Sequence, residues 1–456
     1  MQATVQTTES SKLKSGESVK KAPKVLLAET YRWPFTALFA LDLAKAGCDI
    51  SFVCPSHHPV LKTRAVRQIF RYSGLRPLQS LEAAIDATGP DLIIPCDDRA
   101  VEHLHELHNR ARIMGAQDRN MAALVEKSLG SPESYAVVSS RYNLLKIARE
   151  EGLRVPDTER INSESDLQLW QGRQAFPWVL KADGTYGGHG VRMVQTRKQA
   201  ASFLTELIEY YTASRAIKRL CINRDAFWLR PWWKGVKPII TVQSYIHGKP
   251  ANCAVVCWNG TVLAGVGVDV LSSAGTTGPA GVVRVSDNPD MMLCAAKIAR
   301  RLNLSGFFGL DFVIEEGTGL TWLIEMNPRP TRVSRLQLGK GRDQVGALLA
   351  QLKGQPAREL PPVTQNKMIA YFPDAWDAKS ELLDLCYHDI PDGGPELVEE
   401  LRSPWPTRTL LWRLMKGTET AESYLRKYLV KPEQANQPNW TPPPDGSRLA
   451  PAKLRD

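Results

Sequence analysis

Residues 308–329 read FGLDFVIEEGTGLTWLIEMNPR, and this stretch decides the fold. Two apolar runs flank a turn that contains two glycines, and this pattern predicts a β-hairpin. If the turn centres on Thr318, Asp311 lies directly opposite Glu325. Side chains alternate between the two faces of a strand, so Asn327 shares a face with Glu325. The apolar neighbours favour a buried hairpin over a solvated sheet edge.

Two carboxylates and an amide oxygen on one face of a hairpin suit a hard cation. Asp311, Glu325 and Asn327 are the kind of oxygen ligands that Mg²⁺ takes when water and phosphate complete its coordination. We therefore predict a Mg²⁺ site here, with Mn²⁺ as the alternative ion.

A second motif lies upstream of the hairpin. The apolar run PWVLKA at 177–182 is followed by DGTYGGHG at 183–190 and by a further apolar run. The four glycines of this loop would let backbone N–H groups approach phosphate oxygens, and Lys181 would add a compact positive charge. A simple glycine-rich turn is the alternative reading. The motif is not a P-loop, because the chain contains no GxxxxGK[ST] sequence.

Together the two motifs resemble the ATP-grasp superfamily of ATP-dependent carboxylate ligases. The likeness spans about residues 22–349 and includes SRYNLLKIA at 140–148, EGLRVP at 151–156 and QSYIHG at 243–248. It implies a mixed α/β and α+β protein with an ATP-grasp fold, an N-terminal doubly wound α/β domain and a small C-terminal module.

The resemblance also implies that the protein uses ATP with Mg²⁺, and it assigns roles to individual residues. In relatives, two cations hold the triphosphate, one arginine faces the reacting phosphoryl group and a backbone segment lies against the adenine. Carried over to this sequence, the catalytic candidates are Arg329, Lys181 and Arg284; the ATP contacts are Arg141, Lys181, Gly187, Gly188, Gly190, Gln243, Ser244, Tyr245 and Ile246; and the metal ligands are Asp311, Glu325 and Asn327.

One position departs from the family pattern. Many relatives place a glutamate after the adenine segment to hold the ribose hydroxyls, and this chain has Gly248-Lys249-Pro250-Ala251-Asn252 there. Because proline has no side-chain hydrogen-bonding group, Asn252 or Gln243 would have to hold the ribose instead, or the ribose is held weakly.

Length and composition set broad limits. The chain has 456 residues, 43% of them hydrophobic, so it can bury more than one core. It has no run of eighteen apolar residues and no apolar leader, so we expect a cytoplasmic protein.

Eight cysteines without a CxxC pair are expected to be reduced. His103, His105 and His108 lack metal-ligand spacing, so we do not expect a metal on their helix.

Changes in composition divide the chain into five parts. We expect disorder in residues 1–22 and in the proline-rich tail 431–456. Between them we predict an N-terminal α/β domain over 23–130, an ATP-grasp domain over 131–352 and a C-terminal module over 353–430.

The first domain carries polar residues at the expected strand ends, where open α/β sheets bind ligands. These residues are Tyr31-Arg32-Trp33 and Cys96-Asp97-Asp98-Arg99. They would touch substrate, or Asp97 or Asp98 would only cap the following helix.

The net charge of +10 belongs to appendages and not to the core. Residues 214–238 look like an insertion within the ATP-grasp domain and alone carry +6, and no nucleic-acid motif accompanies them, so we expect no nucleic-acid partner. Their aromatic rings alternate with cations, which suits a peripheral membrane contact, an anionic substrate or a partner surface, and residues 410–416 would add a second such patch. The alternative is a lid whose tryptophans pack against the core.

The function predicted from these observations is an ATP-dependent ligase. It would phosphorylate a small-molecule carboxylate and pass the acyl group to an amine or thiol, releasing ADP and phosphate. The alternatives are a carbamoyl-phosphate-synthase-like or other phosphotransfer enzyme, and a non-catalytic ATP-binding sensor or scaffold. The acid, the acceptor and the oligomeric state do not follow from the sequence.

Overall fold

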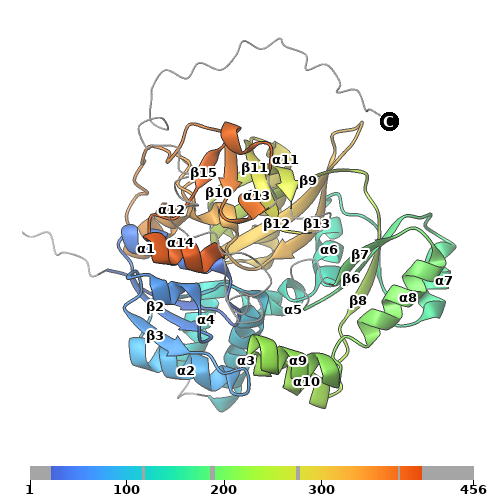
Figure 1. Ribbon diagram of the computed structural model, residues 1–456, viewed down its shortest axis with the longest axis horizontal. Helices are drawn as coiled ribbons and strands as arrows, with labels where there is room; N and C mark the ends of the chain where they lie inside the picture. The colour runs from blue at the N-terminus through green and yellow to red at the C-terminus, as the bar shows by residue number, and fades with distance from the viewer. Residues whose placement is uncertain (1–21, 116–118, 185–189, 274–277, 378–379, 403–456) are drawn as a thin grey trace, which may run out of the picture.

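The computed structural model describes residues 22–115, 119–184, 190–273, 278–377 and 380–402, which form three β-sheets with helices packed on them (Figure 1). The predictions for residues 1–21, for the patch at 410–416 and for the tail at 431–456 lie outside the described residues.

The N-terminal domain is a four-stranded parallel sheet in the order β3-β2-β1-β4, as predicted for a doubly wound α/β fold. Both faces of its first strand are buried, because Val25 and Leu27 pack against α1 whereas Leu26 and Ala28 pack against α2 and α3. Its elements are β1 (Lys24–Ala28), α1 (Pro34–Lys45), β2 (Asp49–Cys54), η1 (Pro59–Lys62), β3 (Gln68–Arg71), α2 (Pro77–Thr88), β4 (Leu92–Pro95), α3 (Asp98–Met114) and α4 (Arg119–Leu129).

A small lobe follows, built on an antiparallel sheet in the order β5-β8-β6-β7. Trp178 is fully buried in the core that this sheet forms with α7 and α8. The segment from residue 130 to the end of the lobe contains η3 (Pro132–Ser134), α5 (Tyr135–Val138), α6 (Arg141–Glu150), β5 (Thr158–Arg160), α7 (Glu164–Gln171), β6 (Trp178–Ala182), β7 (Val191–Val194), α8 (Arg197–Ile208) and β8 (Ile240–Ser244).

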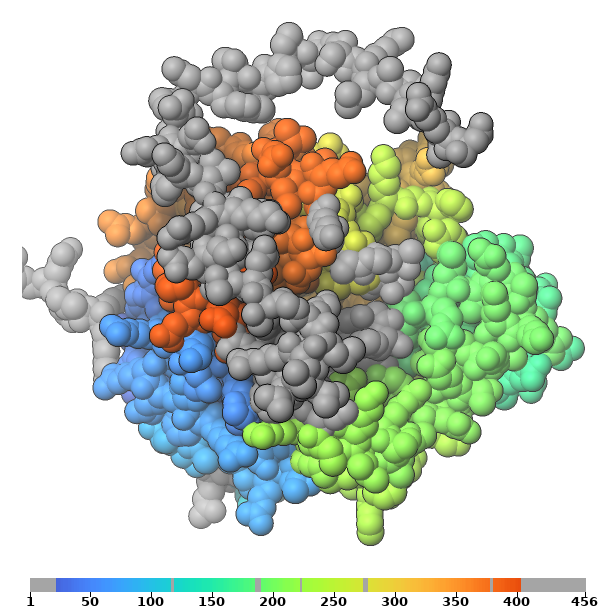
Figure 2. Space-filling view, in the orientation of Figure 1, coloured from blue at the N-terminus to red at the C-terminus, as the bar shows by residue number. Residues whose placement is uncertain are grey.

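The predicted insertion lies between α8 and β8 and is helical. It contains α9 (Ala213–Asn223), η4 (Ala226–Trp228) and α10 (Leu229–Trp233), and it extends from the small lobe to α3 of the N-terminal domain (Figure 1). In the space-filling view its side chains adjoin those of the N-terminal domain (Figure 2). The insertion therefore bridges two parts of the protein.

The large sheet has seven strands in the order β13-β12-β9-β10-β11-β14-β15. Helix α11 covers one face, where Met291, Cys294 and Ile298 pack against β9 and β12. The elements are β9 (Gly248–Trp258), β10 (Thr261–Ser273), β11 (Ala280–Ser286), α11 (Pro289–Leu302), β12 (Gly306–Glu315), β13 (Thr321–Asn327), η5 (Arg332–Arg335) and α12 (Gln344–Lys353).

The described residues beyond 353 continue this sheet and do not form a sheet of their own. β14 (Met368–Tyr371) pairs with β11, and β15 (Tyr387–Asp389) pairs with β14. After α13 (Asp374–Asp377) and η6 (Leu383–Leu385), α14 (Pro395–Arg402) returns to the N-terminal domain, where Leu397 joins the core around α1 (Figure 1). None of the described helices combines the length and the apolar character needed to cross a membrane.

Candidate active site

The β12–β13 hairpin has the predicted register. Asp311 pairs with Glu325 and Gly309 with Asn327. A register shift after Asp311 marks a β-bulge, a feature that re-aims side chains next to functional sites. Asn252 of β9 donates to Asp311 Oδ1 at 2.6 Å, and Asn327 Nδ2 donates to Asp311 Oδ2 at 3.0 Å. Two amides therefore orient this carboxylate.

Two cations reach the hairpin from other elements. Arg141 stands at the first position of α6, after the helix cap Ser140, and its Nη2 donates to Glu325 Oε1 at 2.6 Å. Its Nη1 donates to Asp183 Oδ1 at 2.9 Å. Lys181 is the next-to-last residue of β6, is 4% exposed, and places its Nζ 3.5 Å from the carbonyl oxygen of Ile324. The structure thus brings Arg141, Lys181 and the paired carboxylates together.

The electrostatics of the group follow from burial and from these neighbours. Burial lowers the pKa of Lys181 to about 8, and Arg141 acts in the same direction. Burial together with Glu325 raises the pKa of Asp311. Burial would also raise the pKa of Glu325, but Arg141 and Lys181 outweigh it, and the pKa is lowered. Two close carboxylates destabilise each other's charge unless a cation lies between them.

The donor set fits a divalent ion and a polyphosphate. Asp311, Glu325 and Asn327 offer oxygen atoms on one face of the hairpin, the ligand type of Mg²⁺. Next to them, Arg141 Nε and Asp183 Oδ2 are buried without a hydrogen-bond partner among the described residues. Buried polar atoms are costly without partners, so a polar ligand at this place would stabilise them.

Arg329 connects this group to the N-terminal domain. Its Nε donates to Asp98 Oδ1 at 3.2 Å, its Nη2 donates to Asn327 Oδ1 at 3.1 Å, and its guanidinium lies 4.2 Å from the ring centre of Trp33. Asp97 instead caps α3 by accepting from the N–H of Ala100 at 2.8 Å. The capping alternative therefore holds for Asp97, and contact of Asp98 with substrate stays a prediction.

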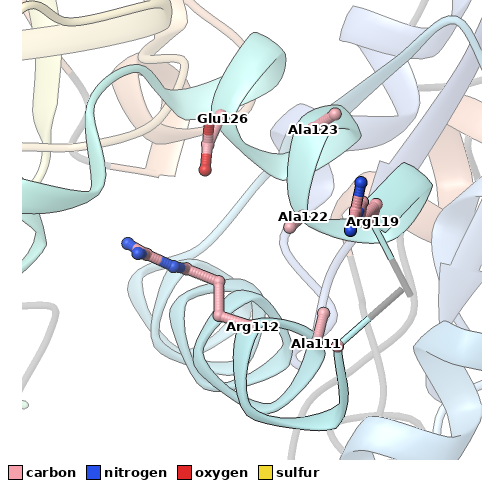
Figure 3. A pocket seen from close by; sticks show the side chains of 7 residues that line it. Ala111, Arg112, Arg119, Ala122, Ala123 and Glu126 are labelled. Carbon is pink, nitrogen blue, oxygen red and sulfur yellow. The ribbon is translucent and has the colours of Figure 1, made fainter. Parts of the chain in front are cut away.

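A cavity of about 60 Å³ lies between these groups. It is lined by residues of α3, α5, α6, the glycine loop and β13, including Glu102, Ser139, Arg141, Gly184 and Glu325. A second pocket, of about 320 Å³, lies between α3 and α4, where Arg112 extends from α3 and Glu126 from α4 (Figure 3). It is lined by none of the predicted site residues.

The predicted adenine segment joins the two sheets. Gln243 and Ser244 end β8 in the small lobe, and Tyr245 and Ile246 lead to β9 of the large sheet. Gln243 is 3% exposed and donates to Thr158 Oγ1 at 3.2 Å. Of the two candidates for the ribose, Asn252 is thus bound to Asp311 and Gln243 to β5.

In the glycine loop, the carbonyl of Gly190 accepts from the N–H of Ala182 at 2.9 Å. The other two glycines predicted to contact ATP, Gly187 and Gly188, lie outside the described residues.

Arg284 is the predicted site residue that the structure does not bring to this group. Residues that pair across neighbouring strands form a row, and the side chains of one row point to the same face of the sheet. Asp311 of β12 pairs with Asn252 of β9, and Asn252 pairs with Val268 of β10. Arg284 pairs with Asp269, which belongs to the neighbouring row and so points to the opposite face. There Arg284 donates to Asp269 Oδ2 at 2.9 Å.

The three histidines of α3 each have a different neighbour. His103 contacts the Tyr72 hydroxyl at 3.0 Å, His105 stacks on Tyr135 at 3.8 Å and His108 contacts Glu126 at 2.7 Å. Among the described residues, no group of three or more metal-ligating side chains of the His, Cys and acidic types was found.

Sequence reasoning did not predict the contacts of three residues of the site, although it named the segments that contain them. Asp183 follows the predicted strand that ends in Lys181, so its place in the loop was a usable signal. Asp98 and Trp33 come from another domain, and no local pattern relates them to Arg329.

Comparisons with known proteins relate the chain to a family and a fold. A family model described as an ATP-grasp domain matches residues 138–333. The carbamoyl phosphate synthase large chain of Xylella fastidiosa (strain 9a5c) is 23% identical over 397 residues, which cover 77% of this chain and 35% of that relative. The chain thus spans about a third of the length of that curated relative.

Solved structures share the fold at low identity. An N5-carboxyaminoimidazole synthase from Aspergillus clavatus, in complex with ADP and 5-aminoimidazole ribonucleotide, is 14% identical, with a TM-score of 0.55 over 75% of this chain and 80% of that one. An L-amino acid ligase from Bacillus licheniformis, also 14% identical, has a TM-score of 0.52 over 75% and 77% of the two chains. The biotin carboxylase domain of Hydrogenobacter thermophilus 2-oxoglutarate carboxylase, with ADP and magnesium, has 14% identity and a TM-score of 0.51 over 75% and 72%.

Proposed function

Because the chain contains an ATP-grasp domain over residues 138–333, we propose that it is an ATP-dependent ligase that activates a small carboxylate as an acyl phosphate. An amine, or else a thiol, then takes the acyl group, and ADP and phosphate leave. The solved structures that share its fold include ligases and a carboxylase domain.

The observation that carries the proposal is that three cations reach strand β13 beside the Asp311–Glu325 pair. Arg141 donates to Glu325, Lys181 donates to the carbonyl of Ile324, and Arg329 donates to Asn327. Three cations from different segments lie close to two carboxylates and Asn327. Together these are the charged and polar groups that phosphoryl transfer requires. Phosphoryl transfer depends mainly on positioning and on neutralising charge, without a covalent protein nucleophile.

Each residue has a part that its position supports. Lys181 and Arg141 would bind the triphosphate, and Asp311, Glu325 and Asn327 would hold Mg²⁺. Bound there, the ion would neutralise charge on the transferred phosphoryl group. Arg329 would stabilise charge that develops on the reacting phosphoryl group in the transition state, and the stacked Trp33 together with Asp98 would fix its guanidinium plane.

Trapping with hydroxylamine tests this function. An acyl phosphate reacts with hydroxylamine to give a hydroxamate, so the protein with MgATP, hydroxylamine and a panel of small acids should form hydroxamate and ADP in equal amounts. AMP and pyrophosphate as products would refute the proposal, because the cations and the metal ligands would then act on the wrong phosphate. N-hydroxycarbamate and ADP formed with bicarbonate alone, and no hydroxamate from any carboxylic acid, would favour the carbamoyl-phosphate-like alternative.

Two other outcomes point to the remaining alternatives. ADP formation without hydroxamate would indicate a phosphotransferase that acts on a hydroxyl group. Stabilisation by MgATP without turnover would indicate a sensor or scaffold, and Pro250, where relatives have a ribose-binding glutamate, would be the first residue to examine.

We also propose that the insertion contacts anionic membranes. Trp228 is 4% exposed and packs with Tyr210, so one tryptophan belongs to the core, as the lid alternative expects. Trp233 is 83% exposed, and Trp232 lies beside it at 37%. Exposed tryptophans next to Lys234 and Lys237 match the chemistry of an interface with anionic lipids.

A further inference from the structure

Two buried carboxylates lie at the carboxyl end of the N-terminal sheet, behind the groups that contact Arg329. Glu29 directly follows β1, Asp97 follows the neighbouring strand β4, and each is 1% exposed. A buried carboxylate is costly unless hydrogen bonds replace its lost water. Burial and the nearby charge of Glu29 raise the pKa of Asp97 to about 6. Two such groups this close together indicate a role that outweighs their cost to stability.

Each of these carboxylates holds one partner of Arg329. Asp97 caps α3, whose first residue, Asp98, accepts from Arg329 Nε. Glu29 Oε1 accepts from the backbone N–H of Trp33, and the ring of Trp33 stacks on the Arg329 guanidinium. Both of these contacts between Arg329 and the N-terminal domain therefore depend on a buried carboxylate.

The second oxygen of Glu29 lies beside His58. His58 Nε2 is 3.3 Å from Glu29 Oε2, and both side chains are fully buried. The N–H of Val60 donates to the other ring nitrogen, Nδ1, at 3.0 Å. A ring nitrogen that accepts a hydrogen bond carries no proton, so the proton of His58 lies on Nε2, the nitrogen next to Glu29. Phe52 packs edge-on against the ring, with 4.9 Å between the ring centres, and helps to fix its plane.

We propose that Glu29 and His58 are positioning residues for Arg329 and act on it through Trp33. The inference rests on the proposed function, because that function gives Arg329 its part in the transition state. The contacts run from the His58 ring to the Glu29 carboxylate, then to the N–H of Trp33 and through its indole to the guanidinium. Other cations hold the nucleotide, so a fault in this path should lower kcat and leave the affinity for MgATP unchanged.

Two substitutions of His58 separate the roles of its ring nitrogens. The amide oxygen of asparagine can take the place of Nδ1, and the amide nitrogen of glutamine can take the place of Nε2, because the side-chain lengths match. His58→Asn therefore keeps the cap of η1 and loses the contact with Glu29, whereas His58→Gln keeps a donor beside Glu29 and loses the cap. Both variants leave part of the ring's volume empty, so both should lower stability. Only His58→Asn breaks the proposed path.

Steady-state kinetics on the full chain, with the acid identified by the hydroxamate assay, measure the effect. His58→Asn should lower kcat by about 10- to 100-fold, as expected for a misplaced catalytic group, with an unchanged Kd for MgATP in calorimetry. The conservative variant His58→Gln should retain most of kcat. In a Trp33→Ala background the path is already broken, so His58→Asn should cause no further loss of kcat. Wild-type kcat in His58→Asn, equal losses in the two His58 variants, or a full further loss in the Trp33→Ala background would overturn the inference.

A spectroscopic measurement tests the same path without turnover. In protein with isotope-labelled tryptophan, the indole N–H signal of Trp33 is assigned by its absence in Trp33→Phe, and it reports on the ring that stacks on Arg329. This signal should shift in His58→Asn and in Arg329→Lys and stay in place in His58→Gln. An unchanged Trp33 signal in His58→Asn would overturn the inference, whereas failure of the hydroxamate assay with a shifted signal would overturn the ligase proposal alone.

Discussion

Arg141 and Glu325 form an ion pair at 2.6 Å across 184 residues of sequence. The arginine side chain is 7% exposed and also pairs with Asp183, so it links the start of α6, the glycine loop and the hairpin. A buried pair of this kind is costly to break on one side only, because the remaining charge loses its partner. A bound triphosphate with its metal ion would offer both residues new partners of the right sign.

Glu325 is the first residue to test. Glu325→Gln keeps the size of the side chain and removes a metal ligand, so kcat for ADP formation should fall by at least about 10²-fold while the circular dichroism spectrum stays unchanged.

Glu316→Gln, in the exposed turn of the same hairpin, is the matched control and should retain full activity. Normal turnover by Glu325→Gln at saturating Mg²⁺ would show that the hairpin does not hold the metal.

Lys181 should contribute mainly to nucleotide affinity. Its buried ammonium faces the place assigned to the triphosphate, and Lys181→Ala should weaken MgATP binding by about 1.5–3 kcal/mol, or about 10- to 100-fold, in calorimetry. Lys198→Ala, on the exposed side of α8, should bind like wild type. An unchanged affinity for Lys181→Ala would leave the glycine loop as a simple turn.

The sequence predicted the local part of this site well. The opposition of Asp311 and Glu325 follows from strand alternation and from the position of one turn, so counting residues was sufficient. The place of Arg284 was not predictable in this way, because which face it occupies depends on pairing across three strands of the large sheet. Trp33 and Asp98 meet Arg329 only through the packing of two domains, which leaves no periodic signal in either segment.

The charge of the insertion identified it in the sequence. Which of its aromatic side chains are buried and which are exposed could not be predicted in the same way. Trp228 and Trp233 both have aromatic and basic neighbours in the sequence. Trp228 is nevertheless only 4% exposed, whereas Trp233 is 83% exposed. The difference arises from the turn of α9 into η4, which directs Trp228 toward Tyr210.

The exposed tryptophans lead to a membrane-binding prediction. Replacing Trp232, Trp233 and Lys234 together by alanine should reduce sedimentation with liposomes that contain anionic lipid, measured at low salt, and wild-type binding should weaken as salt rises. Leu169→Ala removes a side chain that is 68% exposed elsewhere on the small lobe, and it should bind like wild type. Absence of wild-type binding to anionic liposomes at low salt would contradict the membrane proposal.

Two buried histidines of α3 should make the protein sensitive to acid. Burial lowers the pKa of His103 and of His105 to about 3, so both are neutral in the folded protein at any pH above that. In the unfolded chain each has a pKa of about 6.5. Below that pH the unfolded state takes up protons that the folded state refuses, so the free energy of unfolding should fall by about 1.4 kcal/mol per pH unit for each histidine.

Urea titrations at several pH values between 7.5 and 5 measure this loss, and a double variant isolates it from the carboxylates. In His103→Gln/His105→Phe, glutamine retains a group that can contact the Tyr72 hydroxyl and phenylalanine retains the stack on Tyr135, and the stability should depend much less on pH than in wild type. The comparison uses the slope with pH, so a uniform loss of stability in the variant does not affect it. His247→Gln, at an exposed position, should keep the wild-type slope. An equal slope in the double variant and in wild type would show that these histidines are not the groups that titrate.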